Sequence, residues 1–138
     1  MSISYLIQRI LWVDCIGAIV TGLAMLLLSG WLSSLYRLSP AFVIVHAFVH
    51  LIFGTFSFSL AVRRRRPMAL VLLLIFANAA WACLCIAFAI TLVATFPVFA
   101  TGHFALEGIY VGSLAVIEWK WREALSITDR LPDQSSLD

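Results

Sequence analysis

Four consecutive arginines, Arg63–Arg66, separate two long apolar stretches, Ala41–Val62 and Met68–Leu92. A charged side chain is costly in the hydrocarbon core of a bilayer, so this run is expected in a loop between two membrane-spanning helices. Basic loops of membrane proteins stay on the cytoplasmic side. The arginine run therefore places one loop, and the rest of the topology can be counted outward from it.

The composition excludes an ordinary soluble domain. Of the 138 residues, 63% are hydrophobic and 12% are charged, whereas soluble domains carry about 45–50% apolar and about 25% charged residues. A spanning helix needs about 20 mostly apolar residues. We expect an all-α, four-helix transmembrane bundle over residues 1–125, with spans at residues 10–28, 41–62, 68–92 and 102–119, and a disordered cytoplasmic tail at residues 126–138.

The basic residues predict that both termini are cytoplasmic. With the arginine loop inside, the outer side holds only Arg37, and the inner side holds the other eight of the nine basic residues: Arg9, Arg63, Arg64, Arg65, Arg66, Lys120, Arg122 and Arg130. This is a strong positive-inside bias. The arginine run is also predicted to bind anionic lipid headgroups. It lacks the aromatic interleaving of a nucleic-acid-binding surface, so no nucleic-acid partner is expected.

Two pairs of polar side chains lie inside the spans at matched depths. From the helix rise of about 1.5 Å per residue, His46 and His103 lie roughly 5–8 Å from the outer ends of their spans, and His50 and Glu107 roughly 12–14 Å. A spacing of four residues puts each helix's pair on one face. The four groups can meet only if the two faces oppose each other.

Several chemistries fit these four residues, and the sequence leaves them open. Imidazole and carboxylate are good transition-metal ligands. Histidines at one depth on two helices, such as His46 and His103, could hold a haem. A quinone site and a proton path are further alternatives, since histidine titrates near neutral pH. The structural alternative is hydrogen bonding between helices.

Asp14 is the one acidic residue of the first span. A carboxylate at the centre of a span costs about 2.5–3.5 kcal/mol on insertion scales, so it requires an explanation. Either Asp14 and Asn78 bind a ligand or pass protons, or Asp14 has a structural role, in which it pairs with Asn78 or Trp81 or reaches an arginine near the inner surface. Glu118, close to Lys120 in sequence, is expected to be solvated at the inner rim.

Short motifs give the chain a resemblance to known proteins. They are Arg9-x-x-Trp12-x-Asp14, Gly22, Asn78-x-x-Trp81, Glu107-Gly108 and Glu118. Over Arg9–Trp121 the chain resembles a widespread group of small bacterial inner-membrane proteins with four spans, and it has a general likeness to DoxX-like four-span proteins. The resemblance implies a multi-pass protein of the bacterial inner membrane and implies no particular activity.

Three functional hypotheses follow. The leading one is a non-enzymatic accessory or interaction subunit, because Gly108 and Gly112 form a Gly-x-x-x-Gly pair suited to contact with another membrane protein or a second copy. The sequence offers no nucleophile–base–orienter arrangement, so a hydrolase or a transferase is not expected. The second is a proton-coupled transporter or small-ligand binder that uses Asp14, Asn78, His50 and Glu107. The third is a redox protein holding haem, quinone or metal at His46, His50, His103 and Glu107.

Overall fold

The computed structural model describes residues 3–63, 65–95 and 97–126, which form only helices and their connections. The helices are α1 (Ile3–Leu27), α2 (Ser29–Tyr36), α3 (Pro40–Ala61), α4 (Met68–Leu92), α5 (Val98–Lys120) and α6 (Arg122–Ser126). Four stretches are long and apolar enough to cross a membrane: Arg9–Leu27, Pro40–Ala61, Met68–Thr91 and Val98–Lys120. The predicted all-α bundle of four spans is confirmed.

Several helix ends differ from the prediction. α1 begins at Ile3, before the predicted span, and the connection after it contains α2. α5 begins at Val98, directly after Pro97, rather than at residue 102. Proline is well tolerated at a helix start because its missing N–H would have no helical partner there. α6 covers the start of the predicted tail, and residues 127–138 of that tail lie outside the described residues.

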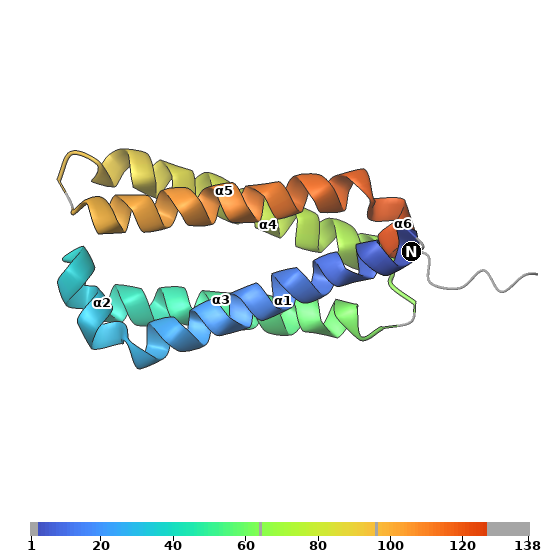
Figure 1. Cartoon of the computed structure of the whole chain (residues 1–138), viewed down its shortest axis with the longest axis horizontal. Helices are drawn as coiled ribbons and strands as arrows, with labels where there is room; N and C mark the ends of the chain where they lie inside the picture. The colour runs from blue at the N-terminus through green and yellow to red at the C-terminus, as the bar shows by residue number, and fades with distance from the viewer. Residues whose placement is uncertain (1–2, 64, 96, 127–138) are drawn as a thin grey trace, which may run out of the picture.

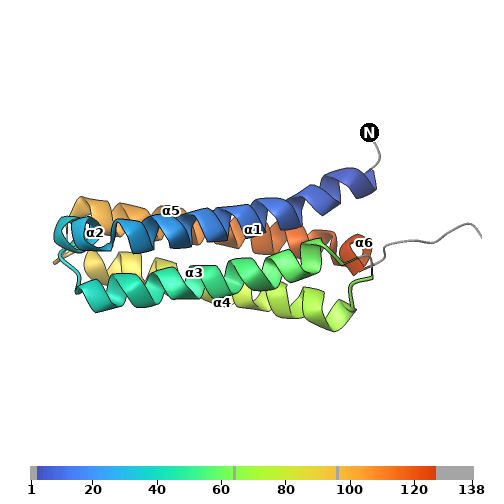
Figure 2. The ribbon, with the colours of Figure 1, turned by 90° about the horizontal axis from the view of Figure 1, so that it is seen from below.

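The four long helices run up and down in sequence around a bundle (Figure 1). α1 packs chiefly with α3, and α4 chiefly with α5. The two views together show that α1 also lies beside α5 and α3 beside α4, so α3 and α5 occupy opposite corners (Figure 2). Side chains of α3 and α5 can therefore meet only in the bundle interior.

The Gly-x-x-x-Gly pair serves a contact within the chain. A Cβ placed on Gly108 would lie 2.8 Å from Ile86 Cδ1 and 3.2 Å from Ala82 O, both on α4. A Cβ on Gly112 would lie 3.4 Å from Ala82 Cβ. Small residues let helix backbones approach closely. The pair therefore explains the close packing of α4 and α5, and the association with another chain that we expected from it remains a prediction.

Arg66 is buried, with 5% of its surface exposed, whereas Arg63 and Arg65 are exposed. Its Nε donates to Leu60 O at 2.7 Å and its Nη2 to Ala61 O at 3.2 Å, at the carbonyl end of α3, while its Nη1 donates to Leu125 O at 3.3 Å. Burial lowers the pKa of Arg66 from its ordinary value. Through these bonds Arg66 ties the end of α3 to α6, so Arg66 has a structural role.

Candidate metal centre and an adjoining cavity

α3, which carries two of the histidines, has a well-defined start. Ser39 caps the helix, since its Oγ accepts a hydrogen bond from Phe42 N at 3.2 Å, and Pro40 occupies the first turn. Both features favour helix initiation at this position. His46 and His50 follow one turn apart on the buried face, with 4% and 7% of their surfaces exposed.

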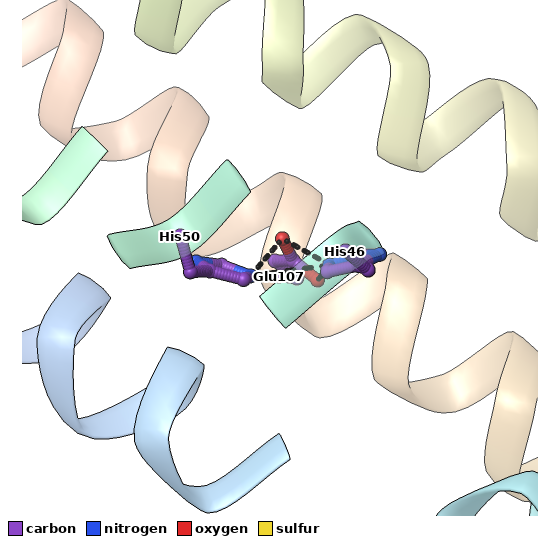
Figure 3. A group of neighbouring side chains, drawn as sticks. All are labelled: His46, His50 and Glu107. Atoms are coloured by element: carbon purple, nitrogen blue, oxygen red, sulfur yellow. Dashed lines mark hydrogen bonds and ion pairs between the residues drawn. The ribbon is translucent and has the colours of Figure 1, made fainter. Parts of the chain in front are cut away.

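Glu107 of α5 lies between these two histidines (Figure 3). Its Oε2 is 3.2 Å from His46 Nε2, and its Oε1 is 3.0 Å from His50 Nε2. His103, one turn before Glu107 on α5, places its Nε2 3.3 Å from the same Oε2. The face of α3 that carries His46 and His50 therefore opposes the face of α5 that carries His103 and Glu107. All three histidines of the chain gather around one carboxylate.

Trp81 of α4 completes the surroundings of Glu107. Its Nε1 donates a hydrogen bond of 2.6 Å to Glu107 Oε1. The sequence suggested Trp81 as a structural partner of Asp14 and gave no reason to pair it with Glu107. The indole holds the carboxylate from a third helix, and the Glu107 side chain is only 7% exposed.

Aromatic rings cover the centre on the side of α2. The Tyr36 ring lies 5.4 Å from the His103 ring, and the Phe104 ring lies 5.4 Å from the His46 ring, centroid to centroid. Burial, and secondarily the charge of Glu107, raises the pKa of the Tyr36 phenol. These rings bury one side of the centre, and electrostatic interactions are stronger in such low-dielectric surroundings.

The donor atoms fit a metal ion. Ligand atoms of His46, His50 and Glu107 all lie within 4.8 Å of one another. Glu107 Oε1 lies 3.3 Å from His46 Nε2 and 3.0 Å from His50 Nε2, and the two Nε2 atoms are 3.1 Å apart. Atoms bound to one zinc-like ion at about 2.2 Å are at most about 4.4 Å apart, so these separations are compatible with a single ion. His103 Nε2 is buried and, despite its proximity to Glu107, has no partner in hydrogen-bond geometry among the described residues. It can therefore serve as a fourth ligand.

The same geometry does not fit a haem between His46 and His103. A porphyrin held by two axial histidines lies between the two imidazoles. Here one carboxylate oxygen, Glu107 Oε2, lies 3.2 Å from His46 Nε2 and 3.3 Å from His103 Nε2. The space that the macrocycle needs is filled by the glutamate, so these residues fit a single ion rather than a haem.

A second buried polar cluster, formed by Asp14, Asn78 and Glu118, lies deeper in the bundle. Asn78 Nδ2 donates to Glu118 Oε2 at 3.1 Å. Within residues 3–63, 65–95 and 97–126, Asp14 Oδ2 and Glu118 Oε1 have no hydrogen-bond partner. Both carboxyls are thus under-supplied with donors, in contrast to Glu107.

The prediction that Glu118 is solvated is wrong, because none of its surface is exposed. Glu118 lies seven residues after Val111, which is two helical turns, and both share the inward face of α5. Proximity in sequence to Lys120 suggested solvent, but helical phase determines the direction of the side chain. Counting the phase from Gly108 and Val111 would have found the buried position.

A cavity of about 290 Å³ joins the two clusters. Its wall includes polar residues of both clusters, namely Asp14, Asn78, His50, His103 and Glu107. Between them the wall is mostly apolar, with Val49, Phe53, Leu106 and Val111 among its residues. The four residues predicted for a ligand or proton path, Asp14, Asn78, His50 and Glu107, therefore border one space.

Fold and site together define a class: a multi-pass α-helical bundle with a buried histidine–carboxylate centre. Comparisons of the chain with protein-family models, curated protein sequences and solved structures found no match. The function must therefore be argued from the site itself.

Proposed function

We propose that this chain is a membrane protein that binds a divalent transition-metal ion through His46, His50 and Glu107, with His103 as the fourth ligand. The observation that carries the proposal is the convergence of three imidazole Nε2 atoms on one buried carboxylate, at 3.0–3.3 Å, from opposite corners of the bundle.

Hydrogen bonding alone does not satisfy this arrangement. To donate to Glu107, His46 and His50 must each carry a proton on Nε2. Their Nε2 atoms are only 3.1 Å apart, however, and a hydrogen bond between them needs a lone pair on one of the two. A neutral pair thus cannot satisfy all three short contacts. A metal ion resolves the conflict, because all the lone pairs then point to one cation.

The donor set indicates which ions fit. Three imidazoles and one carboxylate are nitrogen and oxygen ligands of intermediate hardness, which suit zinc, iron, manganese, nickel or copper better than calcium or magnesium. Trp81 holds Glu107 by the short bond from its indole N–H. Such partners orient a metal ligand and typically affect affinity strongly.

The proposed location is the bacterial inner membrane, with both termini in the cytoplasm. The uneven distribution of basic residues supports this orientation. Arg63 and Arg65 are exposed at one end of the bundle and available to anionic headgroups, while Arg64 lies outside the described residues. A reporter that is active only in the cytoplasm should work when fused after residue 138 and fail when inserted at Ala94.

Metal titration of the purified protein tests the metal proposal. Wild-type protein in mild detergent, stripped with chelator, should bind a single transition-metal ion per chain, as measured by elemental analysis and isothermal titration calorimetry. His50→Ala should lose this ion. Cys83→Ser removes an exposed thiol from α4, away from the centre, and should keep it. Equal binding by wild type and His50→Ala would show that the cluster only joins helices.

A further inference from the structure

Asp14 is a buried carboxylate with an unused oxygen that borders a cavity. Only 5% of its surface is exposed, its Oδ2 has no hydrogen-bond partner among the described residues, and it lines the 290 Å³ space between the helices. A buried charge is strongly disfavoured unless it is paired and hydrogen-bonded. A positively charged ligand in the cavity would supply the missing partner.

The walls indicate what kind of cation fits. An inorganic ion such as calcium requires six to eight oxygen ligands, and the apolar side chains Val49, Phe53, Leu106 and Val111 offer none. An organic ammonium ion needs one counter-ion and apolar contacts for its carbon atoms. The cavity has about the smallest volume that small-molecule sites show, roughly 300 Å³. The wall therefore selects an organic cation.

Aromatic side chains near Asp14 add to this preference. Trp81 and Tyr110 both line the cavity, and aromatic faces attract organic cations. Tyr110 reaches this position because Gly17 has no side chain: a Cβ on Gly17 would lie 2.7 Å from Tyr110 Oη. The Tyr110 hydroxyl donates to Val13 O at 3.4 Å, which keeps the ring beside α1.

We propose that the cavity binds a small lipophilic organic ammonium ion. Its cationic head pairs with the Asp14 carboxylate, and its apolar body lies along Phe53 and Val111. Asn78, which also borders the cavity, contributes an amide beside the head. This inference rests on the cavity and on Asp14, and it does not require a metal ion at Glu107.

The test uses two probes of matched shape, benzyltrimethylammonium and its neutral carbon isostere neopentylbenzene, with the full chain in nanodiscs. Binding is measured by calorimetry or by quenching of tryptophan fluorescence. We expect the ammonium to bind at least about tenfold more tightly than the isostere, a difference of about 1.4 kcal/mol. Equal affinity for the two probes, or no binding of the ammonium, would overturn the proposal.

Variants assign the effect to Asp14. Asp14→Asn should lose the preference for the ammonium by at least about tenfold, while its metal titration stays as in wild type. Glu118→Gln neutralises a buried carboxyl that does not line the cavity, and it should bind the ammonium as wild type does. Retained preference in Asp14→Asn would overturn the assignment.

A second variant decides the question if Asp14→Asn does not fold. Val49→Phe enlarges a cavity-lining side chain on α3 and leaves every polar group of the cavity in place. It should weaken ammonium binding at least about tenfold. Unchanged ammonium binding in this variant would place the ligand elsewhere. Because the metal titration is scored separately, failure of the metal proposal and failure of the ammonium proposal can be told apart.

Discussion

Two buried carboxylate clusters in this bundle differ in how completely their oxygens are partnered. Glu107 has His46 and His103 at one oxygen and His50 and Trp81 at the other. Glu118 and Asp14 each keep one oxygen without a hydrogen-bond partner among the described residues. Burial alone does not account for the difference, because all three carboxylates are buried: 5% of Asp14, none of Glu118 and 7% of the Glu107 side chain is exposed.

The difference lies in what surrounds each carboxylate. Glu107 is enclosed by rigid rings whose nitrogen atoms point toward it, an arrangement prepared for one small cation. Asp14 lies with the small residues Gly17 and Ala18 in the wall of a cavity, and its Oδ2 has no hydrogen-bond partner among the described residues. This difference underlies the two proposals: a metal ion at the crowded carboxylate of Glu107 and an organic cation at the more open carboxylate of Asp14.

The largest effect is expected from Glu107→Gln. The amide keeps the shape of the side chain but removes the anionic ligand. Loss of a residue that only orients a metal ligand costs about 10–100-fold in metal affinity. Because Glu107 is itself a proposed ligand, we expect its metal affinity to fall by more than about 100-fold, as measured by calorimetric titration. Glu118→Gln, the same change on the same helix, is the control. Similar metal affinities in the two variants would contradict the proposal that the metal ion binds at Glu107 and not at Glu118.

A smaller effect on metal affinity is expected from Trp81→Phe. The ring remains, but the N–H that donates to Glu107 Oε1 at 2.6 Å is lost. We expect an affinity lower by about 10–100-fold, as for other residues that orient a metal ligand. Trp119→Phe, at an exposed position of α5, should bind metal as wild type does. An unchanged affinity in Trp81→Phe would mean that Glu107 is positioned without it.

Asn78→Ala probes the second cluster through stability. It removes the donor to Glu118 Oε2 and leaves that buried carboxyl with fewer partners. We expect the free energy of unfolding, measured by titration with SDS in mixed micelles, to fall by about 1–3 kcal/mol. Metal affinity should not change. Cys83→Ala, at an exposed position of the same helix, serves as control. A free energy of unfolding equal to that of the control would show that the hydrogen bond from Asn78 to Glu118 does not stabilise the bundle.

The smallest effect is expected from Glu118→Gln on stability. The neutral amide can still accept the hydrogen bond from Asn78. It replaces a carboxyl group whose Oε1 has no hydrogen-bond partner among the described residues. Replacing a poorly paired buried charge is often neutral or stabilising, so we expect the free energy of unfolding to stay equal or to rise by about 1 kcal/mol. A loss well beyond 1 kcal/mol would indicate that the charge of Glu118 is stabilised in the bundle.

Much of the fold could be predicted because spans are local features. Their length and apolar character belong to single segments, and the arginine run separates two of them. The spacing of His46 with His50, and of His103 with Glu107, also showed that each pair shares a helix face. Their convergence could not be predicted, because the rotation of α3 against α5 depends on the packing of all four helices.

Other features depended on contacts that no local pattern contains. Arg66 belongs to a run that is basic throughout, and only its three bonds to backbone carbonyls distinguish it. The sequence suggested Trp81 only as a structural partner of Asp14, whereas its indole N–H donates to Glu107. Glu118 could have been found from helical phase, since the information was present in the spacing from Val111.

X-ray absorption spectroscopy of the metal-loaded protein tests the central claim most directly. For a cobalt- or zinc-loaded sample, we predict a shell of nitrogen and oxygen atoms at about 2.0–2.2 Å, with the outer-shell scattering of several imidazoles. That scattering should weaken in His46→Ala and remain in Cys83→Ser. An oxygen-only shell without imidazole scattering would describe a hydrated ion at the surface, and it would contradict a metal centre at Glu107.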